Sequence, residues 1–542
     1  MTISFGPITF EGKLVEAQLR RDLRDDWFPD PLYFEDMFDS GYIEYVLTNN
    51  FQLHDGAFHP QIRTLFNIPK SNFTLRYALE TSLAERALYH ALVMLLIPHY
   101  DPLIPWNVFN HRASSNPHSR NLFRRPVPAW QDFTGVVRNA LVSSKVLLST
   151  DIVNYFENIN LSSLNNTLIE ELPNLKAVPS EKANIRIYIS SLFEYLRYWC
   201  YSETAGLPQN RDASSFLANV YMLPIDQFML KSNYQYFRYM DDIKIVCGSK
   251  YDARKALKIL SLELRKLGLS VNSGKTKIVP ATDDSAIGEC LDTGDSDLER
   301  IDSIWQTRSL RPIRRTFPLL SELTQKKLQI GEVESRTFRY CIKRLEILAG
   351  CPEFEVPEIY FSKITPFVIN ALSEHPASTD KLASYIRAVP TTDKDLAKVS
   401  ELLCDETKNF YTWQNYRLWI LLLEKNYRTT DLLNYAMGVV RKHDDNATRC
   451  GATLYAGAFG CKEDRIEIAK RFHSLTSYIG QRAAILAVQE LHFKPYIHDH
   501  VVPWLRDDLK NVYRTLKRRG TYVAPPQPVQ ITSVLDRERN YD

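Results

Sequence analysis

Hydrophobic and polar residues change their spacing along the chain, and these changes divide it into five segments. Residues 1–60 are acidic and aromatic and predict an N-terminal helical extension. In 61–280, strand-like runs alternate with helical runs, which predicts an α+β domain. Residues 281–300 are rich in Asp, Ser and Gly and predict a linker or loop. Helical patterns fill 301–520, and 521–542 form a Pro-rich tail.

A pair of acidic residues interrupts one of the strand patterns. Tyr236–Met240 and Ile243–Cys247 predict two strands, so Asp241 and Asp242 fall at the tip of the hairpin between them. An ordinary turn would also explain the pair, because Asp tolerates turn geometry. The choice between the two interpretations depends on the rest of the chain.

A third carboxylate closes an earlier strand. Val146–Ser149 are strand-like, and Asp151 follows them. If this strand lies beside the hairpin, the three acids converge into an oxygen cage that suits two Mg²⁺ ions, for which Mn²⁺ could substitute. Without a metal such a cluster would repel itself and raise its own pKa values. Two such ions serve in-line phosphoryl transfer, which makes nucleotidyl transfer the predicted chemistry.

Four ordered motifs resemble those of reverse transcriptases. They are Asp151 with Phe156, then "GLPQ…SSFLANVYM" with a predicted helix at Ser214–Met222, then "YMDD", then "LGLSVNSGKTKI". Upstream, "FNIPKSNFTLRYALETSLAERALYHALVMLLIPHYDP" resembles the fingers segment of the bacterial members. The likeness covers roughly 60–280 and implies the palm and fingers of a right-hand polymerase.

The resemblance implies roles for single residues. Asp151, Asp241 and Asp242 would be the catalytic, metal-binding triad, with the backbone carbonyl of Ile152 as a further ligand. The ring of Phe156 would exclude a ribose 2′-OH, so deoxynucleotides would be the substrates.

Four further residues would bind the incoming nucleotide. Gln209 would touch it, Lys70 and Arg76 would bind its triphosphate, and Lys275 would lie near the leaving pyrophosphate. The alternative for the three cations is a solvated surface position. Asn210 departs from the family pattern, which usually has Gly there. Asn tolerates positive φ, so the turn can form, but a side chain near the usual template base puts ordinary processive copying in doubt.

The helical half indicates a subfamily. A reverse transcriptase core joined to more than 200 helical residues resembles the bacterial abortive-infection enzymes (AbiK, AbiA and relatives) of the defence-associated unknown group. The resemblance implies HEAT-like repeats, phage defence, a homo-oligomer, and DNA synthesis without template or primer, started on a protein hydroxyl. Tyr33, Tyr42 and Tyr45 are candidate priming residues. Arg417, Arg449 and Arg482 recur in similar settings at a spacing typical of helical repeats, or by chance similarity of helices.

Composition bounds the partners and the compartment. A basic stretch from "SLRPIRRTF" to Arg344 could follow the phosphates of a single-stranded DNA product, and possible RNA, or be a solvated face. The formal net charge of +3 is too small to indicate a polyanion partner by itself. The eight Cys are scattered, and the N-terminus turns polar and charged at once. The apolar runs fall short of a membrane span, so we expect a cytoplasmic protein with no membrane contact.

Three functions remain open on the sequence. The first is untemplated, protein-primed DNA synthesis from dNTPs. The second is templated copying of a dedicated noncoding RNA. The third is a non-catalytic nucleic-acid-binding scaffold, against which the intact triad and the aromatic gate both argue.

Overall fold

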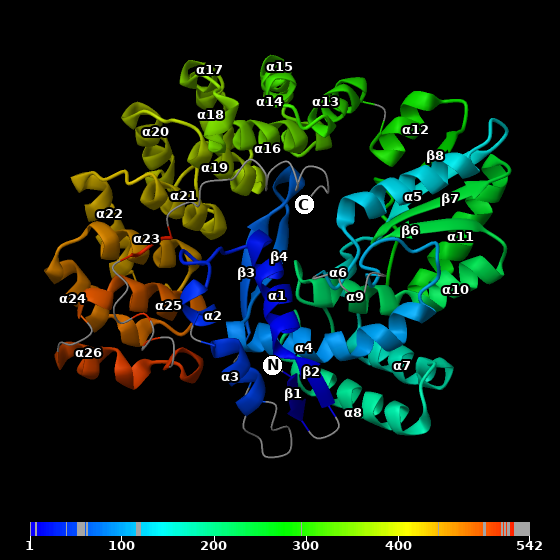
Figure 1. Cartoon of the computed structure of the whole chain (residues 1–542), viewed down its shortest axis with the longest axis horizontal. Coiled ribbons are helices and arrows are strands. Elements are labelled where there is room, and N and C mark those ends of the chain that lie inside the picture. Colours follow the sequence, from blue (N-terminus) through cyan, green and yellow to red (C-terminus); the bar gives the residue numbers. More distant parts are fainter. Residues whose placement is uncertain are drawn as a thin grey trace.

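Figure 1 shows the computed structural model of the 542-residue chain. The description below covers residues 2–5, 8–39, 41–50, 60, 63–114, 121–293, 295–442, 444–491, 495–510, 513, 516 and 521–524. Most of the predicted Pro-rich tail at 521–542 lies outside these residues.

The predicted palm is built on a four-stranded antiparallel sheet of order β6-β7-β5-β8. Its strands are β5 (Val146–Asp151), β6 (Gln235–Tyr239), β7 (Asp242–Cys247) and β8 (Lys277–Pro280). The register places Asp151 opposite Asp242. The three predicted strands of the acidic cluster are therefore confirmed to within two residues, and they lie side by side.

Successive residues of a strand point to opposite sides of the sheet, so its apolar side chains contribute to a core on each face. Leu148 and Ile243 belong to a core that α11 (Lys250–Lys266) helps to form. Leu147 belongs to a separate core under α5 (Pro126–Ala140). The acids lie at neither face but at the end of the sheet where β5 stops and the β6–β7 hairpin turns.

The prediction of a linker at 281–300 is wrong. The helix α12 (Asp284–Leu291) fills its centre, and α13 (Ser296–Gln306) begins before its end. Ile287 and Leu291 lie four residues apart on one helix face and are buried in the core on the α5 side of the palm sheet. The many Asp, Ser and Gly residues around these two apolar positions made the segment resemble a loop in the sequence.

Helices connect the strands of the palm. They are α6 (Tyr155–Asn158), α7 (Leu161–Glu171), α8 (Pro179–Leu196), α9 (Asp212–Tyr221) and α10 (Leu223–Lys231). The helix predicted at Ser214–Met222 is α9, which begins two residues earlier and ends one residue earlier.

The predicted fingers are a β-hairpin with a long buried helix behind it. β3 (Thr64–Pro69) pairs with β4 (Leu75–Glu80), and α4 (Leu83–Tyr100) follows. Ser82 and Glu85 form a capping box that fixes the start of α4. α4 packs on α1, α3, α8 and α9, so it joins the fingers to the palm and to the N-terminal segment.

The N-terminal segment is only partly the helical extension that the sequence predicts. A strand pair, β1 (Thr2–Phe5) with β2 (Ile8–Glu11), precedes its helices. The helices are α1 (Gly12–Asp22), α2 (Glu35–Phe38) and α3 (Tyr42–Asn50). Between α1 and α2, residues 23–34 cross from the palm to the helical half of the chain, as the contacts below show.

The described residues of 301–520 hold no strand, in agreement with the predicted all-helical region. Its main helices are α14 (Leu310–Arg314), α15 (Phe317–Gln329), α16 (Arg336–Gly350), α17 (Glu358–Ser362), α18 (Thr365–Glu374), α19 (Thr379–Ala388), α20 (Asp393–Cys404), α21 (Thr412–Glu424), α22 (Thr430–Arg441), α23 (Ala447–Phe459), α24 (Lys462–Lys470), α25 (Tyr478–Ala487) and α26 (Pro495–His500). No helix in the described ranges is long and apolar enough to cross a membrane.

These helices stack in series. α16, α19, α21, α23 and α25 each pack against the next, and α18, α20 and α22 form a second series in the same order. Figure 1 shows the result as an arc that leaves the palm at α13 and returns to the fingers and N-terminus at α21–α26. Serial stacking of this kind is what repeat proteins show, and the HEAT-like assignment stays a prediction.

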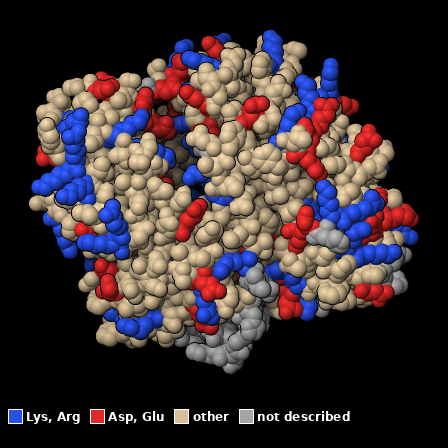
Figure 2. Space-filling view, turned by 180° about the vertical axis from the view of Figure 1, so that it is seen from behind, with Lys and Arg blue, Asp and Glu red and all other residues tan. Residues whose placement is uncertain are grey.

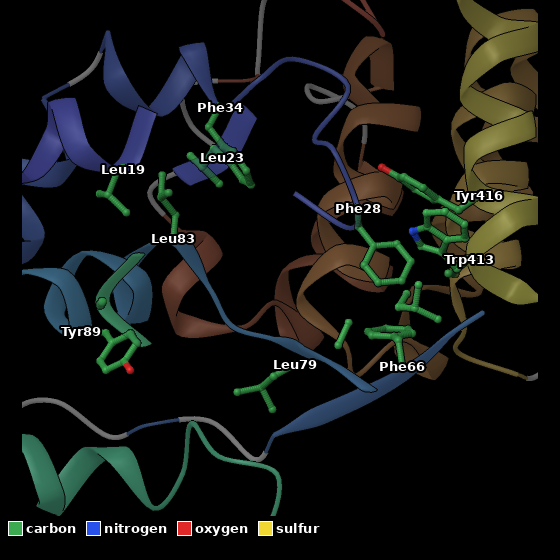
Figure 3. Packing of buried hydrophobic residues seen from close by; sticks show 14 of the residues in the cluster. Leu19, Leu23, Phe28, Phe34, Phe66, Leu79, Leu83, Tyr89, Trp413 and Tyr416 are labelled. Carbon is green, nitrogen blue, oxygen red and sulfur yellow. The ribbon is translucent and has the colours of Figure 1, made fainter. Parts of the chain in front are cut away.

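One hydrophobic core crosses the boundaries between the segments (Figure 3). The Phe28 ring lies 4.7 Å from the ring of Phe66 on β3 and 5.5 Å from the ring of Tyr416 on α21. The Trp413 indole donates a hydrogen bond to the Trp27 carbonyl at 2.8 Å. The N-terminal segment is therefore packed between the fingers and the helical region.

The recurring arginines of the helical region serve this contact. Arg417 donates to the Asp26 carbonyl at 2.6 Å, and Arg482 pairs with Asp30 and Asp36. Arg449 is also buried but donates to Ser474 within the helical region. Two of the three positions thus hold the N-terminal segment.

Candidate active site

Asp151 and Asp241 meet at the open edge of the palm sheet. Asp151 is the last residue of β5, and Asp241 lies in the two-residue turn between β6 and β7. Met240, the other turn residue, has φ of 57°, which reverses the chain tightly. The Ile152 amide donates to the Asp241 carbonyl at 3.1 Å and fixes the turn against the end of β5. Burial, and then the nearby Asp151 carboxylate, raise the pKa of Asp241 above its ordinary value.

Two lysines form ion pairs with the outer carboxylates. Lys275 donates to Asp151 at 2.8 Å from an exposed position. Lys244 is buried and donates to Asp242 at 2.5 Å and to Ser149 at 2.8 Å. The sequence interpretation included Lys275 and missed Lys244. The signal was present, because residues two apart on a strand share a face, so Lys244 had to lie on the same side as Asp242.

The donor chemistry of this edge fits a divalent cation. Asp151 and Asp241 present facing carboxylates whose mutual repulsion a cation would relieve, and oxygen ligands are what Mg²⁺ prefers. Within the described ranges, however, no three His, Cys, Asp or Glu side chains converge as a metal site. Metal binding by Asp242 and by the Ile152 carbonyl stays a prediction. When bound, the ion would supply charge neutralisation at the reacting phosphate.

A buried network supports the hairpin from behind. Arg238 donates to both carboxylate oxygens of Asp226, at 2.8 and 2.5 Å. It also donates to Asn219 and to the Met240 carbonyl, both at 2.9 Å. Tyr236 adds a 2.9 Å bond to Asp226. Since Arg238 and Asp226 are fully buried, this network fixes the turn that carries Asp241. Sequence reasoning missed it, because no local pattern links these positions.

The predicted gate and the predicted nucleotide contact lie on two segments that are bonded to each other. Phe156 is half-buried on α6, with its ring 5.6 Å from that of Tyr155. The Phe156 carbonyl accepts from the Leu207 amide at 2.9 Å, which ties α6 to the turn before α9. Gln209 donates to Glu157 on α6 at 3.3 Å. The segment carrying Phe156 and the segment carrying Gln209 are thus joined.

Asn210 has φ of 59°, as its tolerance of the left-handed region allows. Its side chain is exposed. The turn that usually contains Gly therefore forms here with a side chain on it.

The fingers approach α6 through Arg76. Its guanidinium is half-buried and lies 5.4 Å from the Trp27 ring. It also interacts electrostatically with Glu157. Burial lowers the pKa of Arg76, since the nearby carboxylates do not compensate fully. Lys70 is exposed at the far end of the hairpin, where its amide donates to Thr74. Arg76 is thus within electrostatic reach of Glu157, the residue to which Gln209 donates.

The three candidate priming tyrosines differ in exposure. Tyr33 and Tyr45 are exposed, whereas Tyr42 is buried and donates to the Asp508 carbonyl at 3.1 Å. Burial raises the pKa of Tyr42. The pKa of Tyr33 is also raised, because its hydroxyl end is partly buried beside Arg387 although 43% of the residue is exposed. The priming role stays a prediction for all three.

The basic stretch of the helical region is only partly exposed. Arg311 and Arg315 are exposed, but Lys327 and Lys343 pair with glutamates at 2.5 and 2.9 Å, and Arg344 is buried. Figure 2 shows basic and acidic side chains interspersed over one face, with a hollow near its middle. A nucleic-acid role for this stretch stays a prediction.

Comparison with known proteins agrees with the geometry. The family model of reverse transcriptase (RNA-dependent DNA polymerase) matches residues 68–311. No curated protein matches the chain. A solved structure of telomerase from Candida albicans, in complex with a TWJ fragment of telomeric RNA, is similar with 11% identity and a TM-score of 0.31 over 72% of this chain and 70% of that chain. A likeness at that level bears on neither fold nor function.

Residues 68–311 are therefore a reverse transcriptase domain with palm and fingers. The chain is a nucleotidyltransferase of the RNA-directed DNA polymerase class. The matched range includes α12 and α13, which the sequence interpretation had left outside the polymerase core. Reverse transcriptases generally use divalent metal ions such as Mg²⁺, in line with the donor chemistry of Asp151 and Asp241.

Proposed function

We propose that the protein is a cytoplasmic, homo-oligomeric DNA polymerase of antiphage defence that adds dNTPs without a nucleic-acid template and starts on one of its own tyrosines. Asp151 and Asp241 carry the nucleotidyl transfer with Mg²⁺, and Phe156 selects deoxynucleotides. The paired acids at the end of β5 and in the β6–β7 turn are the observation that carries the polymerase activity.

Two features beside Gln209 support untemplated synthesis. Asn210 adds an exposed side chain where the family usually has none. Directly after it, the N-terminus of α9 is covered by α1: the Asp212 amide donates to Asp22 at 3.1 Å, and Gln18 donates to the Asp212 carboxylate. The N-terminal segment thus lies against the motif B helix, close to where a template strand would pass.

The test is a reaction without template or primer. Purified, nuclease-treated protein is incubated with Mg²⁺ and labelled dNTPs and run on a denaturing gel. We expect label that migrates with the protein and is sensitive to both DNase and protease. Mass spectrometry of the labelled peptide then identifies the tyrosine.

Asp241→Asn is the control, and we expect it to lose at least about 100-fold of the activity because it removes a carboxylate at the reacting centre. Synthesis that occurs only when co-purified RNA is kept, and that yields a defined sequence, would instead favour templated copying of a noncoding RNA. Unchanged protection against phage in cells carrying Asp241→Asn would favour a non-catalytic scaffold.

A further inference from the structure

A cavity of about 190 Å³ lies beside the motif B turn, outside the acidic edge of the palm. Asn210 and Arg211 line it from the turn, Arg21 from α1, and His111 and Arg124 from the segment before α5. Arg211 is two residues after Gln209, the predicted nucleotide contact. The cavity therefore adjoins the place where a nucleotide would bind.

The cavity is also tied to the catalytic hairpin. Pro126, at the start of α5, is part of its wall. The Pro126 carbonyl accepts a hydrogen bond from Tyr239 of β6 at 3.0 Å. A group held in the cavity would thus lie between the motif B turn and the strand that leads to Asp241.

Of the two acids that line the cavity, Asp212 is fully engaged and Asp22 is engaged through one oxygen. His111 lies 2.9 Å from one oxygen of Asp212, and Gln18 donates to the other. Burial would raise the pKa of Asp212, but the His111 contact outweighs it and lowers the pKa to about 2. Oδ1 of Asp22 accepts from the Asp212 amide, whereas Oδ2 lies 3.6 Å from Arg211 and has no hydrogen-bond partner among the described residues. These carboxylates serve the local structure.

Two basic side chains of the cavity, in contrast, each leave a ring or guanidinium nitrogen without a partner among the described residues. Nη1 of Arg21 and Nδ1 of His111 are buried and have no hydrogen-bond partner in the described part of the chain. Burial, and then the neighbouring Arg86, lower the pKa of Arg211, and Asp26 and Asp22, 3.7 and 3.6 Å away, offset this only in part. Arg124 is exposed at the same cavity. The lining holds three arginines and two aspartates, so it carries net positive charge, and the buried Nη1 of Arg21 is a donor that an anion in the cavity would satisfy.

We propose that this cavity binds a phosphate group of a nucleotide strand, with Arg21 and Arg211 as its main ligands and Arg124 at its mouth. Arginine is suited to this role because its planar guanidinium can donate two parallel hydrogen bonds to phosphate oxygens. The proposal rests on the polymerase function above. It assigns to α1, which lies outside the matched reverse transcriptase range, a direct part in holding the strand.

The test is strand binding without synthesis. A fluorescein-labelled 12-nucleotide oligo(dT) is titrated into full-length protein carrying Asp241→Asn, with anisotropy as the readout at several salt concentrations. We expect Arg21→Gln in this background to weaken binding about five- to tenfold. We also expect it to reduce the slope of log K against log salt by about 0.7, the value for one lost phosphate contact on a single strand.

Arg20→Gln is the matched control. Arg20 precedes Arg21 on the same helix but pairs with Glu16 and Glu35 at 3.0 and 2.8 Å, away from the cavity. Arg20→Gln removes the same charge as Arg21→Gln but leaves the cavity intact. We therefore expect it to change oligonucleotide affinity by less than twofold. If Arg21→Gln fails to fold, exposed Arg124→Gln takes its place, with the same expected direction.

A second arm separates the sources of the phosphate. Inorganic phosphate and dTTP are titrated into the same variants by calorimetry. Weaker phosphate and dTTP binding with unchanged oligo(dT) binding would assign the cavity to a free nucleotide. If Arg21→Gln and Arg124→Gln bind oligo(dT), phosphate and dTTP with the same affinity as Arg20→Gln, the proposed phosphate site is wrong. Because no step requires synthesis, this result is independent of whether the enzyme copies a template.

Discussion

Two lysines make the three acids of the active site unlike one another. Lys244 is buried and donates to Asp242, whereas Lys275 reaches Asp151 from solvent. An exposed lysine can move away when a metal binds, but a buried one is held by Ser149 and by the sheet around it. Asp241 forms no ion pair with a lysine within the described part of the chain. Burial raises the pKa of Asp241 and of Asp242, but Lys244 opposes the rise at Asp242. We therefore expect Asp242 to act mainly with Lys244.

Replacing Lys244 tests this assignment. Lys244→Met leaves Asp242 without its partner beside two other acids, so we expect the free energy of unfolding to fall by about 1–3 kcal/mol. Adding Asp242→Asn to the same chain should recover part of the loss, which a double-mutant cycle in urea would measure. Strictly additive losses would contradict a specific Lys244–Asp242 pair.

A second prediction at the residue scale concerns Phe156, the proposed steric gate. The ring of Phe156 packs against Tyr155 and is only half-buried, so truncation opens space without emptying a core. We expect Phe156→Ala to raise ribonucleotide incorporation relative to deoxynucleotide incorporation at least about tenfold, since the excluded 2′-OH then fits. Competition between labelled dTTP and UTP measures the ratio. Free use of ribonucleotides by the unaltered enzyme would show that Phe156 is no gate.

At the scale of elements, the β6–β7 hairpin depends on a charge pair hidden behind it. Arg238 bonds Asp226 on α10 and the Met240 carbonyl in the turn, and both charged side chains are fully buried. The hairpin is also held by the pairing of β7 with β5 and by the Ile152 amide, whereas this network reaches its turn from behind. The network thus acts through the turn on Asp241, which makes Arg238 a positioning residue.

Removing Arg238 should harm both stability and chemistry. Arg238→Met leaves a buried Asp226 carboxylate unpaired, a change that costs roughly 3–5 kcal/mol. Arg238→Lys keeps the charge but loses the forked geometry, so we expect a lower kcat with a KM for dTTP within about twofold of the original. Tyr236→Phe is the milder control, because it loses one hydrogen bond to Asp226, worth about 1 kcal/mol. A rise in KM alone would contradict a positioning role.

At the scale of the whole molecule, the helical region closes back onto the polymerase domain. The arc leaves the palm at α13 and returns where α21 packs on β3. Glu80, at the end of β4, accepts a hydrogen bond from the Ile479 amide at the start of α25. Contacts that join distant segments hold the fingers and the helical region in one arrangement.

Glu80 makes the stability of this arrangement depend on pH. Burial raises its pKa from 4.5 to about 7, so the folded chain keeps a proton there that the unfolded chain has lost. Between these two values the free energy of unfolding therefore falls as pH rises, by up to about 3 kcal/mol from this one group. We expect Glu80→Gln, which mimics the protonated form, to match the original chain near pH 5 and to exceed it at pH 8.

Urea unfolding at the two pH values measures this difference. Glu322→Gln on α15 is the control, because that side chain is exposed and its removal should shift stability equally at both pH values. Parallel pH profiles for Glu80→Gln and the original chain would contradict the buried-carboxylate account.

The sequence by itself determined the chemistry and the local geometry of the site. Asp241 and Asp242 are adjacent, so any hairpin at that point carries both, and Asp151 follows directly on a strand-like run. That this strand pairs with the hairpin, with Asp151 opposite Asp242, came from the structure. The left-handed turn at Asn210 and the helix after it were equally local. The helical nature of 301–520 followed from periodicity alone. Local spacing decides such features because the interacting residues are close along the chain.

The tertiary structure decided what joins distant residues. No local pattern in the sequence indicates that Lys244 bonds Ser149. The same holds for the pairing of Arg238 with Asp226. The stripe of α12 becomes recognisable only when the palm sheet that buries it is present. The cavity beside motif B needs α1, α5 and α9 brought together from three parts of the chain. Burial and charge pairing are properties of the folded neighbourhood, and a linear pattern does not contain them.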